Sequence, residues 1–186
     1  MEETQPMRKI VAGLFISLDG VTESPQNWQM GLMDAEAGAD VGDSMEEADT
    51  ILLGRRTYQE FAAYWPNGSP DEPFAAYINN TPKLVVSNSL ASVDWQGTTI
   101  ISGDVNAQLA ELKQGHGKNL GITGSVTLVR SLLRDELLDE LRLQVYPIVV
   151  GSGKRLVEES IGTKQLKPVD STISTNGIAL LHYQPA

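Results

Sequence analysis

The 186-residue sequence contains no cysteine, which excludes disulfide bonds, thiolate nucleophiles and cysteine-bound metal sites. It also has no apolar run long enough to span a bilayer, and residues 1–6 are acidic and polar, unlike a signal peptide. Basic residues are few, because 14 Lys and Arg face 24 Asp and Glu, which gives a formal net charge of −10. This charge argues against nucleic acid or an anionic membrane as a partner. We expect a cytoplasmic protein.

Histidine is scarce as well. His116 and His182 are far apart in the sequence and indicate neither a metal pair nor a catalytic triad. The acidic clusters at residues 46–49 and 135–136 are most simply solvated surface. We therefore expect no metal site.

The length favours a single domain over residues 1–186, of which residues 1–7 are expected to be a flexible tail. Apolar runs rich in β-branched residues predict strands at residues 10–18, 50–53, 83–87, 98–101, ending at 121–122, and 141–150. Helical spacing predicts helices at residues 34–48, 58–65, 105–112 and after 125. Residues 166–174 and 178–183 flank Thr175-Asn176-Gly177, a strong hairpin signal. This order predicts a mostly parallel sheet with helices on both faces and an antiparallel C-terminal hairpin.

One stretch joins a buried strand directly to a helix through Gly54, Arg55, Arg56 and Thr57. Glycine allows a ligand to approach the backbone closely, and a helix start offers unpaired N–H groups with a positive dipole end. The arginines add formal charge. Together these features suit a phosphate or pyrophosphate. The alternative is an ordinary turn whose arginines are solvated.

The same arrangement recurs at Gly121-Ile122-Thr123-Gly124-Ser125, where a strand again leads into a helix. Ser87 and Asn88 end another strand, where they can bind a ribose or its phosphate or simply form a turn. The fingerprint of the doubly wound dinucleotide fold is absent, and Gly151-Ser152-Gly153-Lys154 lacks the spacing of a phosphate-binding loop. We interpret that last segment as a loop whose Lys154 and Arg155 can face an anionic ligand.

Taken together, these segments resemble the dihydrofolate-reductase-like superfamily. The resemblance covers residues 8–183 and rests on Leu53-Gly54-Arg55-Arg56-Thr57-Tyr58, Lys83-Leu84-Val85-Val86-Ser87 and the segment 121–129. The segments 16–20, 139–143 and 146–151 are most similar to the reductase domain of riboflavin biosynthesis. The resemblance implies a three-layer α/β/α sandwich, and a homodimer.

The resemblance also implies NADPH as the cofactor. It places Gly54, Arg55, Thr57, Gly121, Gly124, Ser125 and Val126 at the cofactor phosphates, and Ser87 and Asn88 near the adenosine ribose and its 2′-phosphate. It places Asp19 and Gly20 beside the nicotinamide and the substrate. Trp28 and Tyr58 are further candidate substrate contacts.

The roles of two of these residues stay open. Asp19 can position substrate or a proton-donating water, or it can only build a turn with Gly20. Trp28 is either a core plug or a pocket wall.

The favoured function is therefore NADPH-dependent reduction of a small heterocycle, with the pyrimidine of riboflavin synthesis first and a pterin second. Thr123 replaces a glycine of folate reductases, and Trp28 lacks their preceding Leu-Pro. Both departures disfavour folate. A non-catalytic nucleotide-binding module is the alternative from another class. Residues 141–150 are strongly apolar for a strand near a sheet edge, which also predicts a homodimer. Because zinc-binding cysteines are absent, any deamination in riboflavin synthesis would require another protein.

Overall fold

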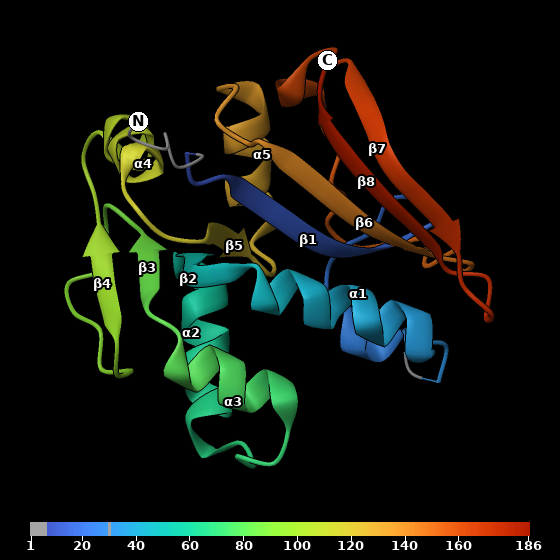
Figure 1. Ribbon diagram of the computed structural model, residues 1–186, viewed down its shortest axis with the longest axis horizontal. Coiled ribbons are helices and arrows are strands. Elements are labelled where there is room, and N and C mark those ends of the chain that lie inside the picture. Colours follow the sequence, from blue (N-terminus) through green and yellow to red (C-terminus); the bar gives the residue numbers. More distant parts are fainter. Residues whose placement is uncertain (1–6, 30) are drawn as a thin grey trace, which may run out of the picture.

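The computed structural model describes residues 7–29 and 31–186, so most of the predicted N-terminal tail lies outside the described residues. Eight strands form one sheet in the order β4-β3-β2-β5-β1-β6-β8-β7 (Figure 1). The strands are β1 Ile10–Ser17, β2 Ala48–Gly54, β3 Lys83–Val86, β4 Thr98–Ile101, β5 Asn119–Ile122, β6 Glu140–Tyr146, β7 Leu166–Ile173 and β8 Ala179–Pro185. The helices are α1 Ala35–Glu46, α2 Arg55–Tyr64, α3 Pro73–Asn80, α4 Val105–Gln114 and α5 Val126–Arg134.

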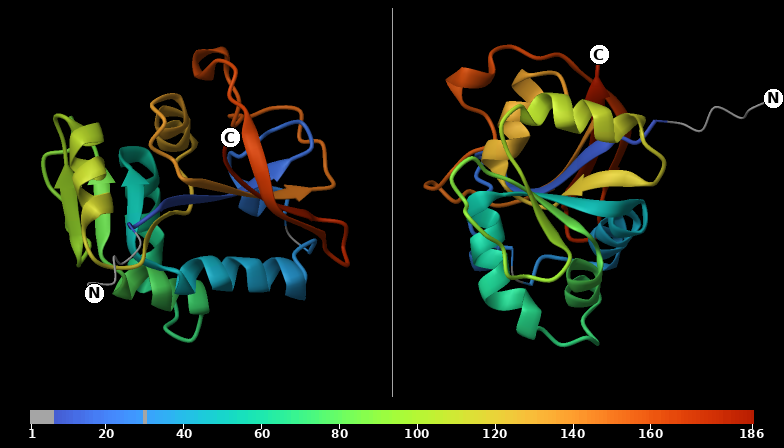
Figure 2. Two further views of the ribbon diagram at one scale, coloured as in Figure 1. Left: turned by 45° about the horizontal axis from the view of Figure 1, so that its top comes forward. Right: turned by 90° about the vertical axis from the view of Figure 1, so that its left-hand side faces the viewer.

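The helices cover both faces of the sheet, which confirms the predicted three-layer α/β/α fold. Helices α4 and α5 lie on one face, and α1, α2 and α3 lie on the other (Figure 2). The larger apolar cluster packs α5 against β1, β5 and β6, and a second cluster packs α2 and α3 beneath β2 and β3. No helix of the described chain is long and apolar enough to cross a membrane.

All strand pairs from β4 to β6 are parallel, and β8 pairs antiparallel with both β6 and β7. This confirms the mostly parallel sheet and the C-terminal hairpin. Because parallel strands end at the same edge, the turns that follow β1, β2, β3 and β5 are close together. The sheet therefore gathers the segments that the sequence marks as ligand-binding.

A strand forms here as predicted, over residues 140–146, but the expectation that it lies near a sheet edge is wrong. The strand β6 lies between β1 and β8, which explains its apolar residues without a second subunit. The edge strand on this side of the sheet is β7, and seven of its eight residues are exposed. The homodimer stays a prediction, now without this argument.

Helix α3 was missed, because it is only eight residues long and lies between a loop-like segment and Pro82. Its stability is mostly tertiary, since Ala75 and Ile78 are fully buried. The buried Lys83 ammonium also donates hydrogen bonds to the carbonyls of Ile78 (2.8 Å) and Thr81 (2.9 Å) at the end of the helix. Such long-range contacts leave no periodic signal in the sequence.

Candidate functional site

The turns that begin α2 and α5 are in contact, because β2 and β5 are neighbouring parallel strands. A Cβ atom on Gly54 would lie 2.1 Å from the Ser125 hydroxyl oxygen and 3.2 Å from its Cβ, so Ser125 would have to turn its hydroxyl away and shift. The glycine thus allows Ser125 of the second turn to approach the backbone closely. A Cβ on Gly124 would lie 3.7 Å from the Thr57 methyl carbon, so these two residues are also neighbours. The two predicted phosphate sites therefore form one group.

Both helix starts in this group lack a side-chain cap. Neither Gly54 nor Ser125 provides a side-chain hydrogen bond to the first turn that follows it. The free N–H groups and the positive ends of the two helix dipoles therefore lie side by side, which suits an anion with two phosphates. Ser125 has a left-handed backbone (φ 72°), a conformation that is costly for a residue with a side chain and concentrates at ligand sites.

The charged residues of the first turn are exposed. Arg55 donates a 3.2 Å hydrogen bond to the side chain of Gln59, one turn along α2, and Arg56 is exposed as well. Both guanidinium groups are therefore accessible to a phosphate in solution. Val126 packs its side chain against the main apolar cluster, so only its backbone can serve a ligand.

Ser87 and Asn88 lie at the same edge, after β3, but their side chains contact the protein's own backbone. The Ser87 hydroxyl accepts hydrogen bonds from the amides of Ser89 (3.2 Å) and Leu90 (3.0 Å). The Asn88 side-chain oxygen accepts one from the amide of Gly103 (2.8 Å), which ties this turn to the end of β4. The turn-forming alternative accounts for these contacts.

Two predicted residues are not brought to this group. Gly121 lies inside β5, where a Cβ would come within 3.1 Å of the Ala48 side chain, so packing accounts for the glycine. Tyr58 is only 6% exposed, and its hydroxyl accepts hydrogen bonds from the amides of Asp94 (3.1 Å) and Trp95 (3.4 Å). Helical periodicity predicts that Tyr58 is buried, and the structure confirms this. Periodicity does not tell whether a buried side chain faces a ligand pocket or the apolar core.

Asp19 joins the turn after β1 to the segment after β6. Its carboxylate accepts hydrogen bonds from the Ser17 hydroxyl (2.7 Å) and from the amides of Val150 (3.0 Å) and Gly151 (2.8 Å). These bonds, the Ser17 hydroxyl first, hold the pKa of Asp19 well below its usual range. A carboxyl group that stays ionised at neutral pH is a poor proton donor. The hydrogen bonds to Val150 and Gly151 make Asp19 a link between the two loops.

Arg155 completes this loop junction and was missed as a partner of Asp19. Its Nε donates to the Asp19 carbonyl (2.9 Å), and its Nη2 lies 3.4 Å from the carboxylate. Gly20, with φ +84°, sits against the aliphatic part of Arg155. The pairing could not be predicted because the two residues are far apart in the sequence. The glycine-rich loop at 151–153 did indicate that Arg155 can bind an anion, and the anion proves to be the carboxylate of Asp19.

Trp28 is half-buried on the loop between β1 and α1. Its ring meets that of Tyr146 edge-on at 5.6 Å, and its Nε1 donates to the Glu23 carbonyl (3.0 Å). It therefore combines both alternatives, because one side packs on the core and the other faces solvent. Among the described residues, no group of three His, Asp or Glu side chains could hold a metal ion.

Comparison with known proteins assigns the chain to a family. The family described as RibD C-terminal domain matches residues 8–180. The chain belongs to the RibD C-terminal domain family. Two similar relatives are proteins of Bacillus subtilis (strain 168) named as uncharacterized. YyaP is 28% identical over 188 residues, covering 98% of each chain, and YwjB is 30% identical over 178 residues, covering 95% of this chain and 97% of its own.

Solved structures of the same fold include enzymes of two kinds. A provisionally assigned riboflavin biosynthesis protein from Shewanella sp. PV-4 has a TM-score of 0.78 at 22% identity, covering 96% of this chain and 99% of its own. A dihydrofolate reductase from Enterococcus faecalis, solved with NADP(H), has a TM-score of 0.64 at 14% identity, covering 95% of this chain and 96% of its own. A Thermotoga maritima deaminase and 5-amino-6-(5-phosphoribosylamino)uracil reductase has a TM-score of 0.66 at 13% identity, covering 97% of this chain but 57% of its own. These structures confirm the dihydrofolate-reductase-like fold.

Proposed function

We propose that this protein is an NADPH-dependent reductase of a small heterocyclic substrate, most like the 5-amino-6-(5-phosphoribosylamino)uracil reductase activity named for the Thermotoga relative. The observation that carries the proposal is the contact of Gly54 with Ser125, which places two uncapped helix starts at one edge of the sheet. Membership of the RibD C-terminal domain family supports the same conclusion.

The chain's own residues fit such a cofactor. The first-turn amides of α2 and α5 would hold the two phosphates of the pyrophosphate, with Thr57 and Gly124 beside them. Arg55 would bind a further phosphate through its planar guanidinium. When bound, the cofactor supplies the hydride, and the protein supplies binding and orientation.

In this proposal Asp19 is a positioning residue. It fixes Gly20 and the segment at Val150 and Gly151 relative to one another, at the edge where β1 and β6 end. The half-buried Trp28 would form part of the substrate pocket wall. The pterin alternative gains no specific support from these contacts.

Cofactor fluorescence titration tests the assignment. Loss of a charge-assisted hydrogen bond costs roughly 1.5–3 kcal/mol, so Arg55→Ala should weaken NADPH binding about ten- to a hundredfold. Arg56→Ala is the matched control, since it removes an equally exposed neighbouring arginine. Equal affinity of the wild type for NADPH and NADH, or normal NADPH binding by Arg55→Ala, would refute the NADPH assignment.

Turnover is tested by loss of nicotinamide absorbance with a panel of pyrimidine and pterin substrates. Asp19→Asn should lower turnover with little change in cofactor affinity. Asparagine cannot replace the carboxylate fully, because its amide nitrogen cannot accept the Gly151 hydrogen bond. The melting temperature must therefore be measured alongside. NADPH binding without turnover across the panel would instead favour a non-catalytic nucleotide-binding module.

We also propose that the protein is a cytoplasmic homodimer. The exposed edge strand β7 carries Val169 and Ile173 on its surface, a kind of edge that pairs readily. Light scattering at micromolar concentration tests this, and a monomeric mass would contradict it.

A further inference from the structure

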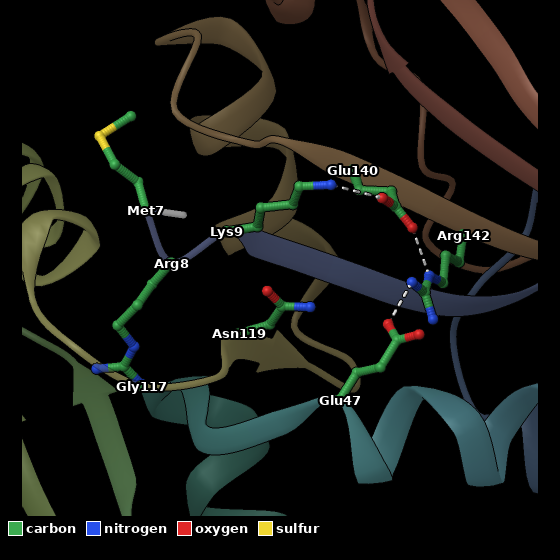
Figure 3. A pocket seen from close by; sticks show the side chains of 8 residues that line it. All are labelled: Met7, Arg8, Lys9, Glu47, Gly117, Asn119, Glu140 and Arg142. Atoms are coloured by element: carbon green, nitrogen blue, oxygen red, sulfur yellow. Dashed lines mark hydrogen bonds and ion pairs between the residues drawn. The ribbon is translucent and has the colours of Figure 1, made fainter. Parts of the chain in front are cut away.

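A polar cavity of about 420 Å³ lies at the amino ends of β1, β5 and β6 (Figure 3). It is lined by Met7, Arg8, Lys9, Glu47, Gly117, Asn119, Glu140 and Arg142. This is the edge of the sheet opposite to Gly54 and Ser125. Eight residues of β1 separate the two edges, which is roughly 25 Å at the usual rise of a strand. The cavity therefore does not belong to the proposed cofactor site.

The cavity contains a buried guanidinium that is held in one orientation. The side chains of Arg142 and Glu140 are only 10% and 8% exposed. Glu140 accepts hydrogen bonds from the Arg142 Nε (2.7 Å) and from the Gln184 side chain (3.1 Å). A buried charge needs such partners, and here they fix Arg142 with its two terminal nitrogens turned away from Glu140.

The second carboxylate that binds Arg142 belongs to Glu47 and, unlike that of Glu140, is exposed to solvent. Glu47 accepts a 2.6 Å hydrogen bond from the Arg142 Nη2, yet its side chain is 48% exposed. Within the described parts of the chain, Arg142 is the one hydrogen-bond partner of that carboxylate. Because the Glu47 carboxylate is half exposed, water can solvate it when it leaves, and Arg142 keeps the buried Glu140 as its partner, so Glu47 can leave Arg142 at low cost.

Two further donors face the space beside this pair (Figure 3). The Lys9 ammonium is 49% exposed and lies 3.7 Å from Glu140. The Asn119 side-chain amide has no hydrogen-bond partner among residues 7–29 and 31–186. Arg8 is neutralised by Asp49 and does not contribute. With Glu47 in place, Lys9 and Arg142 balance the two carboxylates, and without Glu47 one positive charge is uncompensated.

We propose that this cavity binds a small molecule through a carboxylate, which takes the position of Glu47 on Arg142 and is also bound by Lys9 and Asn119. The Glu47 carboxylate shows the group that Arg142 accepts in this geometry, and planar carboxylates suit a guanidinium. The site is independent of the cofactor proposal, because it shares no residue with it.

The test follows the side-chain amide signals of Asn119 by nitrogen-15 NMR, assigned with Asn119→Ser. Sodium acetate is titrated at constant ionic strength, with inorganic phosphate as a second arm. We expect a saturable shift with acetate. Glu47→Gln should tighten acetate binding about two- to fivefold, because it removes the internal competitor. Lys9→Gln should weaken binding about threefold or more.

Lys154→Gln is the matched control, since it makes the same charge change at the other edge of the sheet and should leave acetate affinity unchanged. Arg142→Gln leaves Glu140 buried without its cation and can fail to fold, so the Glu47 and Lys9 variants decide. A linear, non-saturating shift would overturn the proposal. Glu47→Gln binding no tighter than wild type, or saturation by phosphate but not by acetate, would overturn it as well.

Discussion

Helices α1 and α5 pack on opposite faces of the sheet around β6, but different contacts hold them. Helix α5 buries Leu128, Val129 and Leu132 in the main apolar cluster. Helix α1 buries only Ala37. The polar side chains of the sheet that bind α1 are Arg142, Gln144 and His182, which contact Ser44, Glu47, the Ala37 carbonyl and Asp40.

The alternation of β6 explains this difference. Leu141, Leu143 and Val145 face the cluster with α5, whereas Arg142 and Gln144 point to α1. Burial of apolar area holds α5 independently of pH, whereas the attachment of α1 depends on ionised groups. The strand β6 thus supports α5 on one face through contacts that do not depend on pH, and α1 on the other face through contacts that do.

The largest expected loss of stability comes from Arg142, at the centre of the polar face that β6 turns towards α1. Arg142→Met leaves Glu140 buried without its guanidinium partner, which should lower the free energy of unfolding by about 3–5 kcal/mol. Urea denaturation measures this loss. The double variant Arg142→Met/Glu140→Leu should recover much of it, because both buried charges are then gone. A single-variant loss below about 1 kcal/mol would mean that the polar contacts do not hold α1.

On the apolar face, Leu132→Ala should cost about 2–5 kcal/mol by opening a cavity beneath α5. The matched truncation in α1 is Met45→Ala, which should cost less because Met45 is only partly buried. Urea denaturation again compares them. Equal losses would show that α1 is also held mainly by apolar contact.

Acid should release α1 before α5. Burial alone would raise the pKa values of Asp40 and Glu140, but hydrogen bonds from His182 and Gln144 to Asp40, and from Arg142 and Gln184 to Glu140, lower both. A hydrogen bond from the Ala37 amide likewise lowers the pKa of Asp34, which caps α1. Carboxyl groups with lowered pKa values stabilise the fold above their ordinary values, 3.8 for Asp and 4.5 for Glu, and this stabilisation is lost as pH falls through the folded values.

Hydrogen exchange of backbone amides, compared between pH 7 and about pH 3 after correction for the intrinsic rate, checks this expectation, because pH 3 lies below the ordinary pKa values of both kinds of carboxyl group. Protection of α1 should fall while that of α5 is retained. A parallel loss in both helices would remove the distinction between the two faces.

The smallest expected effect is at Glu47. Because its side chain is half exposed, Glu47→Gln should change the free energy of unfolding by only about 0.2–1 kcal/mol. Thermal unfolding at neutral pH provides the measurement. A loss above about 2 kcal/mol would show that the Glu47 contact is a main attachment of α1 to the sheet.

Much of the fold was predictable, because local patterns report it. Apolar runs rich in β-branched residues indicated the strands, and Thr175-Asn176-Gly177 indicated the hairpin. The glycines that precede helices, Gly54 and Gly124, indicated the edge at which the candidate site lies. The partners were not predictable. Gly54 meets Ser125 across two neighbouring strands, and Asp19 meets Arg155 across 136 residues of chain.

By itself, the sequence determined the strand and helix types, the parallel sheet and the residues beside its carboxyl edge, since these follow from short-range periodicity and turn chemistry. Only the tertiary structure decided the order of the strands, and with it the interior place of β6 and the burial of Lys83. It also decided that Arg142 and Glu140 form a buried pair beneath α1. Burial and pairing depend on which elements become neighbours, and neighbours in space are set by packing of the whole chain.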